Sequence, residues 1–399
     1  MDPAIVRELD TPRLRALRAE LRPYDEDRVL EQTSRLRGLG LAPDLVAALL
    51  TQARLADRAT AKFGTAADDL LFTAEGLEQA TRPQLAQRHA RRFVEAGVLT
   101  VWDLGCGIGS DALSLAAAGL EVVAVDSDPG VLAVAAANLA PWPGARTVLG
   151  DVAEVDPGSD AVWFDPARRT VGHADVAGRT RRSSRLEDLS PSWDHVQTVA
   201  ALAPAAGAKL GPSFPHAALP AGSEAQWASF HGELLECVVW WGAAVRCPGP
   251  TAAVHTPDGW EVLTGPAGPG LPLARAGDVP GWLYEPDRAV LRAGLAPRLR
   301  ELLPDAATDD TGGYAVSHVA ADVTWARRWR VLEVLPLRTT PLRAWARSVG
   351  VGPLTVKRRG PGPDPERLRR DLRLTGDVEA TVVVASLGGR TRVLHVEPG

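Results

Sequence analysis

The sequence has few residues that could form a covalent or metal framework. It contains three cysteines in 399 residues, Cys106, Cys237 and Cys247, which are too few and too scattered for a disulfide framework or a zinc site. His216 and His231 each lack a cysteine or carboxylate at metal-ligand spacing. We therefore expect neither a structural metal nor a metal cofactor.

Long apolar runs and a strong net charge are also absent. No run is long enough to span a bilayer, and no N-terminal segment has the pattern of a signal peptide, so a cytoplasmic protein without a membrane partner is expected. The formal net charge of −5 gives no overall field that would favour nucleic acids, and any basic surface must be local. The basic residues are almost all arginine. Because this bias is typical of a GC-rich genome, arginine abundance alone does not indicate RNA binding.

Residues 98–128 contain a strand–helix–strand pattern with glycines at the first turn. An apolar run at 98–104 predicts a buried parallel strand, a helix follows to about 118, and a second apolar strand at 121–125 ends in Asp126. The glycines allow positive φ angles and a close approach of backbone to ligand, and the helix N-terminus offers free N–H groups. Asp126 can accept two hydrogen bonds from the hydroxyls of a ribose. The pattern predicts a site for a nucleoside-bearing cofactor.

The glycine spacing distinguishes between cofactors. Gly105, Gly107 and Gly109 follow a G-x-G-x-G pattern, whereas a dinucleotide site requires G-x-G-x-x-G beneath a pyrophosphate. The carboxylate of Asp103, just before the glycines, suits a ligand with a cationic amino-acid tail and would repel a pyrophosphate. The stretch D-L-G-C-G-I-G-S resembles motif I of class I S-adenosylmethionine (SAM) dependent methyltransferases, and V-V-A-V-D-S-D resembles their ribose-binding strand end. A nucleotide-dependent oxidoreductase is the alternative that this spacing disfavours.

This resemblance implies SAM as the cofactor. It assigns the methionine part to the glycine turn, the amino group to Asp103 and the ribose to Asp126. A third strand at 146–150 ends in Asp151, and L-G-D-V at 149–152 resembles the motif whose acid reaches the adenine amine; Asp156 is its competitor. The predicted cofactor-binding residues are Asp103, Gly105, Gly107, Gly109, Asp126, Ser127 and Asp151.

A fourth predicted strand, at 161–164, runs into the sequence D-P-A-R-R. Ligands gather at the carboxyl ends of parallel strands, and this stretch occupies the place of the D/N-P-P-Y/F/W motif of enzymes that methylate exocyclic nitrogens on bases. The chain keeps Asp165 and Pro166 but has Ala167 for the second proline and Arg168 for the aromatic residue. The departure argues against an exocyclic amine as the acceptor, although Arg168 could stack by its guanidinium plane or clamp a phosphate. We predict Asp165, Pro166 and Arg168 as catalytic residues.

The region before the first strand is predicted to be helical. Periodicity over 1–65 indicates a small helical bundle packed on the catalytic domain, and Thr81 can cap a helix that begins near Pro83. In class I enzymes the segment just ahead of the first strand often covers the cofactor. A capped helix that merely joins two domains is the alternative. The candidates to face the SAM carboxylate or the substrate are Thr73, Glu75, Gln79, Thr81 and Arg82.

Two arginine-rich stretches are candidate substrate contacts. One is the polar loop at 171–195, for which a solvated lid is the alternative. The other follows a predicted strand that ends in Lys357-Arg358-Arg359 and includes one helix with further arginines. The predicted substrate-binding residues are Arg169, Arg181, Arg182, Lys357, Arg358 and Arg359.

The remaining pattern is mainly that of strands. Runs at 208–211, 233–241 and 252–255 predict strands, with the last two as an antiparallel pair. Trp240 and Trp241 are predicted to be core residues. Residues 282–303 predict a turn and an amphipathic helix. A final hairpin turns at Gly388-Gly389, a dipeptide that two-residue turns favour.

Several stretches together resemble one family. K-F-G, F-T-A-E-G-L-E-Q-A-T, F-D-P-A-R-R, G-E-L-L-E-C-V-V-W-W-G and V-K-R-R-G-P-G-P-D-P-E-R-L-R-R-D-L-R-L-T-G-D resemble bacterial class I methyltransferases with a C-terminal THUMP-like domain, whose core is similar to the trimethylguanosine cap synthase type. The resemblance implies an α/β fold: a class I, Rossmann-like methyltransferase domain (66–264) with an N-terminal helical region (1–65), a linker and helical connection (265–322) and a small α+β THUMP-like domain (323–399).

What the resemblance implies about function is methylation of RNA, since THUMP domains are RNA-binding modules. A small-molecule methyltransferase and a non-catalytic SAM- or RNA-binding protein remain as alternatives. The pattern does not predict the oligomeric state.

Overall fold

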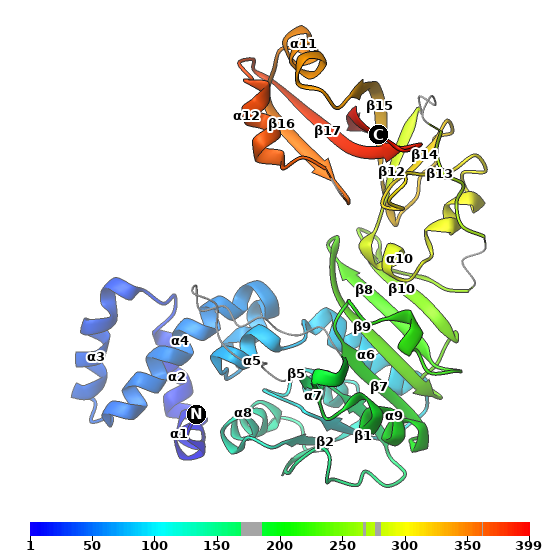
Figure 1. The fold of residues 1–399 in the computed structure, drawn as a ribbon. Helices are drawn as coiled ribbons and strands as arrows, with labels where there is room; N and C mark the ends of the chain where they lie inside the picture. Colours follow the sequence, from blue (N-terminus) through cyan, green and yellow to red (C-terminus); the bar gives the residue numbers. More distant parts are fainter. Residues whose placement is uncertain (169–185, 266–268, 276–280, 361) are drawn as a thin grey trace. The chain divides into compact units, whose positions relative to one another are not determined.

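The computed structural model describes residues 1–168, 186–265, 269–275, 281–360 and 362–399 (Figure 1). The chain divides into two compact units. The first unit comprises Met1–Glu224 with Val238–Pro248, and the second comprises Ala225–Cys237 with Gly249–Gly399. In the described part of the chain, no helix is both long and apolar enough to cross a membrane.

The first unit begins with helices, as predicted. They are α1 (Pro3–Leu9), α2 (Pro12–Glu20), α3 (Val29–Gly38) and α4 (Pro43–Phe63). Their buried leucines form one hydrophobic cluster that also includes Ile108 of the glycine turn and Val134 of helix α8 (Pro129–Leu139). The helical bundle therefore packs directly on the glycine turn and on α8.

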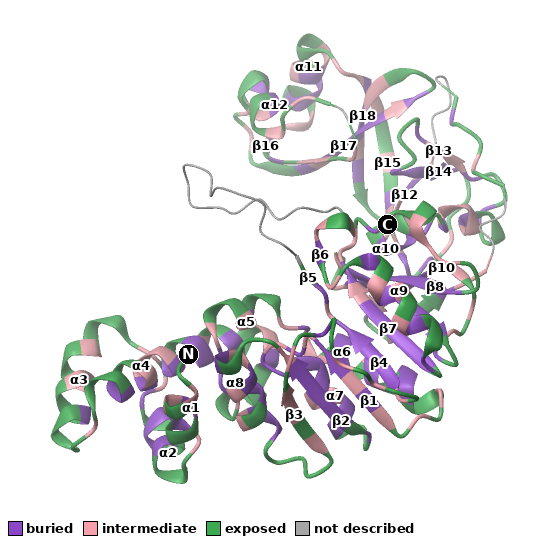
Figure 2. Ribbon diagram, turned by 60° about the horizontal axis from the view of Figure 1, so that its bottom comes forward, coloured by how far each residue is buried: buried purple, intermediate pink, exposed green. Residues whose placement is uncertain are grey.

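Five parallel strands of a nine-stranded sheet form the centre of the first unit (Figure 2). They are β1 (Thr100–Leu104), β2 (Glu121–Asp126), β3 (Ala145–Leu149), β4 (Ala161–Phe164) and β7 (Ala205–Leu210), in the order β7-β4-β1-β2-β3. Helices α5 (Ala74–Gln79), α6 (Pro83–Glu95), α7 (Ser110–Ala117) and α9 (Trp193–Leu202) complete the unit, with the short strands β5 (Ala167–Arg168) and β6 (Leu189–Ser190). Strand order reverses between β1 and β4, and in such sheets ligands bind at that point.

Tryptophans fill the core between the sheet and α6. This core includes three rings: Trp163 of β4, Phe93 of α6 and Trp240. Each is no more than 1% exposed, and the ring centres lie 5.6 to 6.3 Å apart. Trp240 and Trp241 are both buried, which confirms their prediction as core residues. Aromatic packing of this kind stabilises the sheet whose carboxyl edge carries the site.

The predicted pairing of the strands at 233–241 and 252–255 is wrong. Strand β9 (Glu233–Gly242) neighbours β7 and β8 (Glu224–Phe230), whereas β10 (Gly249–Thr256) neighbours β8 and β11 (Gly259–Leu263). Strand β8 escaped prediction because its residues are buried on both faces although Glu224, Gln226 and Ser229 are polar. Such a strand has neither the alternation nor the continuous apolar run on which the prediction depended.

A buried ion pair between Arg92 and Glu224 stabilises the first unit where the chain leaves it. Both guanidinium nitrogens of Arg92 donate to the carboxylate of Glu224, at 2.7 and 3.0 Å. The same carboxylate accepts from the backbone N–H groups of Arg246 and Cys247, at 2.9 and 3.3 Å. Because Glu224 is fully buried, these donors compensate a charge that would otherwise be costly to bury.

The second unit contains a second sheet. Its strand order is β13 (Ala307–Thr308), β14 (Ala315–Ser317), β12 (Trp282–Pro286), β15 (Ala326–Pro336), β18 (Arg390–Pro398), β17 (Val378–Leu387) and β16 (Val351–Arg358). One core joins the sheet to helices α11 (Thr339–Val349) and α12 (Pro365–Leu372), and another forms around Leu283, Tyr314 and Trp329. The predicted α+β character of this region is confirmed.

Three details of the second unit can be compared with the sequence prediction. Residues 282–303 begin with strand β12 rather than with a turn, and helix α10 (Arg288–Arg292) is short. The C-terminal module has two helices in its described residues where one was expected. The hairpin at Gly388-Gly389 is confirmed, since Leu387 pairs with Arg390 and both glycines have positive φ, 56° and 74°.

Candidate active site

The glycine turn after β1 has the backbone conformation that the sequence predicted. Gly105, Gly107 and Gly109 have φ angles of 91°, 56° and 86°, which L side chains rarely adopt. A Cβ at Gly105 would lie 2.9 Å from the backbone oxygen of Asp165. The first glycine is therefore required both by its φ angle and by the close approach of the turn after β4.

Asp126 fixes the glycine turn from the end of β2. Its carboxylate accepts from the backbone N–H of Gly107 at 3.0 Å and from that of Asp128 at 3.0 Å. The side chain is partly exposed, and Ser127 beside it is exposed. A carboxylate anchored at the strand tip in this way still presents oxygen to solvent and can accept hydrogen bonds from a ligand.

Asp103 is a buried carboxylate with little compensation. It is 1% exposed, and neither of its oxygens makes a hydrogen bond of regular geometry within the described residues. Burial, followed by the negative charges of Asp111 and Asp165, raises its pKa well above the ordinary value. The charge of Lys209 and the backbone N–H of Ala112 oppose this rise in pKa only in part. A cationic group bound beside it would remove that penalty, so this residue fits the ammonium of an amino-acid tail.

Asp111, at the start of α7, is buried but compensated. It accepts from the Oγ1 of Thr81 at 2.6 Å and lies 2.8 Å from the Nδ1 of His89. Although burial alone would raise its pKa, the hydrogen bond and charge of His89 lower it below the usual value. The predicted role of Thr81 as helix cap is wrong: Arg82 is the N-cap residue of α6, and it makes no side-chain cap bond. The hydroxyl of Thr81 instead donates a hydrogen bond to Asp111.

Asp165 directly follows β4 and forms an ion pair with Lys209 near the end of β7. The two residues meet because β4 and β7 are parallel neighbours, with Phe164 opposite Ala208. Lys209 also donates to the Oγ1 of Thr81 at 2.9 Å. Asp165 is therefore connected through Lys209 and Thr81 to Asp111.

A second lysine lies near this pair. The Nζ of Lys62, at the end of α4, donates to the backbone oxygens of Leu77 and Glu78 at 2.9 and 3.2 Å. Burial, together with the charges of Lys209 and Arg82, lowers the pKa of Lys62 to about 8, while the charges of Asp165 and Glu78 oppose this shift. Lys62 and Asp165 therefore act on each other electrostatically.

The segment ahead of the first strand is fastened to the glycine turn. The side chain of Asn138 bonds the backbone N–H and oxygen of Leu71, at 2.8 and 3.1 Å, and the oxygen of Ile108 at 2.9 Å. Thr73 caps α5 through the N–H of Gly76 at 2.9 Å. These bonds are consistent with a segment that lies over the turn. Glu75 and Gln79, which were candidates to face the cofactor or the substrate, hydrogen-bond each other at 2.8 Å.

The other predicted site residues in the first unit lie in varied positions. Asp151 follows β3, is exposed and accepts from the N–H of Ala153 at 2.9 Å. Pro166 is buried, and Arg168 lies in β5, where it pairs with Leu189. Arg169, Arg181 and Arg182 lie outside the described residues.

The predicted basic cluster of the second unit is partly engaged within that unit. Lys357 and Arg359 both form ion pairs with Glu285, at 2.8 and 3.4 Å. The Arg358 side chain is exposed and donates to the oxygen of Gly362 at 3.0 Å. Arg358 is therefore the member of the cluster that is best placed to reach a partner.

Lys62, Lys209, His89 and Asp111 were missed by sequence reasoning. A signal for two of them was present: the chain has three lysines among 44 basic residues, at positions 62, 209 and 357. Because lysine and arginine are not interchangeable, these three positions can be singled out from the sequence for inspection. His89 and Asp111 carry no comparable signal, because only the fold brings them together.

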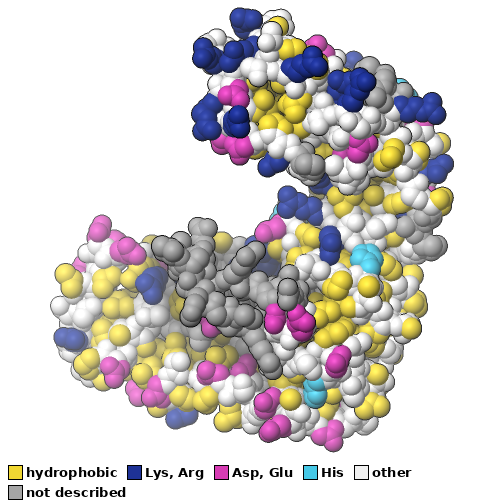
Figure 3. Space-filling model, in the orientation of Figure 1, with side chains coloured by type: hydrophobic (Ala, Val, Ile, Leu, Met, Phe, Trp, Pro, Cys, Tyr) yellow, Lys and Arg dark blue, Asp and Glu magenta, His cyan; other side chains and the backbone are white. Residues whose placement is uncertain are grey.

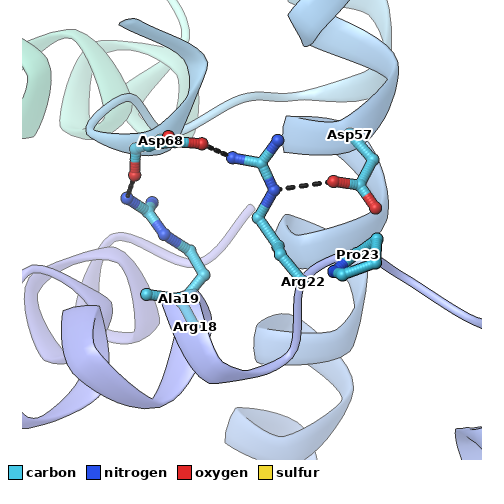
Figure 4. A pocket seen from close by; sticks show the side chains of 6 residues that line it. All are labelled: Arg18, Ala19, Arg22, Pro23, Asp57 and Asp68. Carbon is cyan, nitrogen blue, oxygen red and sulfur yellow. Dashed lines mark hydrogen bonds and ion pairs between the residues drawn. The ribbon is translucent and has the colours of Figure 1, made fainter. Parts of the chain in front are cut away.

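A pocket in the helical region is not a candidate site. Its lining consists of Arg18, Ala19, Arg22, Pro23, Asp57 and Asp68 (Figure 4). Arg22 forms ion pairs with Asp57 and Asp68, and Arg18 donates to the backbone oxygens of Asp68 and Leu70. The arginines here join α2 to the end of α4. The described residues contain no group of His, Cys, Asp and Glu that could hold a metal ion.

Comparisons with known proteins agree with this geometry. A family described as methyltransferase domain matches residues 101–173, and one described as THUMP domain-like matches 326–398. An uncharacterized S-adenosylmethionine-dependent methyltransferase of Mycobacterium tuberculosis is 30% identical over 336 residues, which cover 80% of this chain and 85% of that protein. A crystal structure from Porphyromonas gingivalis W83, of a protein assigned as a methyltransferase, has a TM-score of 0.71 and 20% identity over 98% of this chain and 96% of that one, a likeness of fold. The chain thus belongs to the SAM-dependent methyltransferases, carries a C-terminal THUMP-like domain and uses S-adenosylmethionine as its cofactor.

Proposed function

We propose that this methyltransferase transfers the methyl group to an RNA nucleotide. The observation that carries the proposal is the charge of the THUMP-like segment: residues 326–398 contain 15 Lys and Arg against 7 Asp and Glu, in a chain whose net charge is −5. Lys and Arg side chains gather on the surface over α11 and α12 (Figure 3). A local excess of basic residues in an acidic protein favours a polyanionic partner.

The residues of the first unit have matching roles in this proposal. Bound SAM supplies a methyl group on a positively charged sulfur. Asp103 holds the ammonium of its amino-acid tail, Asp126 with neighbouring Ser127 holds the ribose, and Asp151 holds the adenine ring. Gly105, Gly107 and Gly109 let the backbone approach the methionine part. The support for Asp103 is its buried carboxylate, which has little compensation and which an ammonium would satisfy.

The acceptor is proposed to bind at the end of β4. Asp165, together with the backbone oxygen of Pro166, orients the acceptor, while Arg168 and Arg169 contact the substrate. Orientation contributes most here, because direct displacement needs the nucleophile in line with the methyl group. Arg181 and Arg182 are proposed to hold phosphate groups of the RNA.

Lys357, Arg358 and Arg359 are proposed as RNA contacts of the THUMP-like domain. Lys357 and Arg359 also hold Glu285, so their reversal would disturb the second unit itself. Arg358 and Arg370 are exposed, which makes them cleaner probes.

The decisive experiment is incubation with radiolabelled SAM and separate RNA, protein and metabolite fractions. Label in RNA supports the proposal. Label in metabolites alone would favour a small-molecule methyltransferase, and SAM binding without label in any fraction would favour a non-catalytic protein.

A second experiment measures RNA retardation as a function of salt. Arg358→Glu combined with Arg370→Glu should weaken binding and reduce the salt slope by about 1 for each phosphate that the variant no longer neutralises. The matched control is Arg7→Glu with Arg37→Glu, which reverses two equally exposed arginines of the helical region. Equal weakening in both double variants would contradict a specific role for the THUMP-like domain.

The finer resemblance to trimethylguanosine cap synthases also remains a proposal. Ala167 and Arg168, which replace the second proline and the aromatic residue of the exocyclic-amine motif, argue against a base amine as the acceptor in this chain. Nucleoside analysis of the labelled RNA tests this directly.

A further inference from the structure

Lysine is rare in this chain, and its positions are informative. Of its three lysines, Lys62 and Lys209 belong to the first unit. Lys209 forms an ion pair with Asp165, and both lysines donate to the segment at residues 77–81, Lys62 to Leu77 and Glu78 and Lys209 to Thr81. An arginine can supply charge and hydrogen bonds at such a position, but it cannot lose a proton in a protein, whereas a lysine can. Two lysines on this segment, one of them paired with Asp165, therefore suggest that proton transfer matters there.

The hydrogen bonds of Lys62 leave room for a neutral amine. Two of its N–H groups are used by the backbone oxygens of Leu77 and Glu78. The described residues provide no further hydrogen-bond partner for its Nζ. Loss of the third proton would leave both bonds intact and place a lone pair at the remaining tetrahedral position.

The surrounding charges favour this neutral form. Desolvation comes first, and the cations Lys209 and Arg82 add to it, while Asp165 and Glu78 oppose it; together they lower the pKa of Lys62 to about 8. A base whose pKa lies near the working pH is effective in general base catalysis.

Lys209 has a different position. It forms an ion pair with Asp165 and donates to Thr81, which in turn donates to Asp111. Asp111 is held by His89. This chain of contacts holds the Asp165 carboxylate in place, so Lys209 is a positioning residue.

We propose that the acceptor is a hydroxyl group of the RNA ribose and that Lys62 accepts its proton. This inference rests on the proposed function. The acceptor oxygen forms a bond to the methyl carbon as the carbon–sulfur bond breaks, and the electron pair of that bond stays on sulfur. The O–H bond breaks, its electron pair remains on the oxygen, and the proton passes to the Nζ of Lys62.

A hydroxyl acceptor accounts for a general base at Lys62 and for the residue types at positions 165–168. A neutral hydroxyl is a weak nucleophile until its proton begins to leave, so a positioned base contributes more to its methylation than to that of an amine. Residues 165–168 carry no aromatic ring on which a base could stack. The site thus offers proton transfer rather than a stacking surface.

The first test replaces Lys62 by Arg and by Met. Both variants should bind SAM normally by isothermal titration and lose about 10²-fold or more in single-turnover methyl transfer. In the unaltered protein the rate should rise with pH and level off above about 8, and this rise should disappear in Lys62→Arg. Arg54→Met, an exposed position two turns earlier on α4, should leave rate and pH profile unchanged. A retained pH profile in Lys62→Arg would overturn the role of Lys62.

The second test does not depend on activity. Because the chain has three lysines, acetic anhydride labelling followed by mass spectrometry can resolve each one. The reactivity of Lys62 in the intact protein should reach its half-maximum near pH 8. Reactivity that continues to rise steeply through pH 10 would contradict a readily deprotonated Lys62.

The third test identifies the methylated atom. Total RNA labelled with radioactive SAM is digested to nucleosides and separated by chromatography. Label in 2′-O-methyl nucleosides supports the inference, whereas label in a methylated base overturns it and leaves the proposed function intact. Absence of label in RNA overturns the proposed function itself, and with it the ribose acceptor.

Discussion

The two units treat their buried charges differently. In the first unit, the carboxylate of Asp103 makes no hydrogen bond of regular geometry within the described residues, and the pKa of Lys62 is lowered to about 8. In the second unit, Glu285 lies between Lys357 and Arg359, and Asp309 accepts from the N–H groups of Gly313 and Tyr314 at 2.9 Å. The first unit thus combines paired buried carboxylates, Glu224 and Asp111, with Asp103 and Lys62, which lack an oppositely charged partner among the described residues, whereas Glu285 and Asp309 of the second unit are both compensated.

This difference distinguishes a ligand-binding site from ion pairs that are part of the internal structure. A protein that buries a charge without a partner loses stability, so such a group persists where a ligand completes it. Paired charges such as those around Glu285 need nothing more. Charge compensation therefore distinguishes the ligand-binding edge of the first unit from the internal structure of the second.

The largest expected effect tests the acceptor side of the first unit. Asp165→Ala should reduce methyl transfer by about 10³-fold while SAM affinity stays nearly intact, because the residue is proposed to contact the acceptor and not the cofactor. Asp126→Ala should instead weaken SAM binding. Isothermal titration with both variants, alongside single-turnover rates, checks the contrast. If Asp165→Ala abolished SAM binding, the division of roles would be wrong.

A smaller effect is expected at Glu285, where the charges are paired. Glu285→Gln should lower the free energy of unfolding by about 2 kcal/mol, since it leaves two partly buried cations without their anion. Although burial would raise the pKa of Glu285, its hydrogen bond and ion pair with Lys357 lower it. Its contribution is therefore present above the ordinary pKa of glutamate and is lost as pH falls through the folded value.

Chemical denaturation between pH 3 and 7 measures this contribution. The difference between Glu285→Gln and the unaltered protein should shrink at the acid end. Exposed Glu379→Gln serves as the control, and an equal pH dependence in both variants would argue against the ion pairs.

Asp103→Asn should act in opposite directions on the free and the cofactor-bound protein. Burial raises the pKa of Asp103, so its ionisation destabilises the free protein as pH rises above the ordinary value for aspartate, about 4. The amide removes that loss and should raise the melting temperature of the free protein near neutral pH. It should also weaken SAM binding by about tenfold, because a charged partner of the ammonium is removed.

Melting curves with and without S-adenosylhomocysteine test both parts. The stabilisation by ligand should be smaller in Asp103→Asn than in the unaltered protein. A variant that melted lower without ligand would show that the carboxylate has a structural partner.

The smallest effect concerns the glycine turn. Gly107→Ala meets no atom within 4 Å, and φ is 56°, so it should cost about 1 kcal/mol of backbone strain. Gly105→Ala should cost more, because its Cβ would meet the oxygen of Asp165. Chemical denaturation gives the free energy of unfolding of each variant. Equal losses of stability would indicate that the turn after β4 shifts to make room for the Cβ at position 105.

Local patterns predicted much of the first unit. Strands β1, β2, β3 and β4 follow short apolar runs bounded by turn residues, and each lies within about two residues of its predicted position. The glycine turn and Asp126 belong to the same local pattern. Strand β8 and helix α11 could not be found in this way, because the burial of β8 and the packing of α11 depend on tertiary contacts.

The candidate site was predicted only in part for the same reason. Asp103 and Asp165 follow from their places at strand ends, but Lys62 and Lys209 come from a helix and a strand far apart in sequence. Hydrogen bonds such as that from Thr81 to Asp111 depend on the distance between α6 and α7, which no sequence pattern specifies. Sequence therefore indicated the strand ends that form the candidate site, and the fold indicated which further side chains lie beside them.

The carboxylate of Glu224 has a consequence for how the first unit is closed. Glu224 is the last residue before the chain leaves this unit, and Arg246 and Cys247 lie just before it leaves a second time. One side chain thus secures both departure points of the polypeptide. Its removal would release both segments and leave the buried guanidinium of Arg92 without its carboxylate.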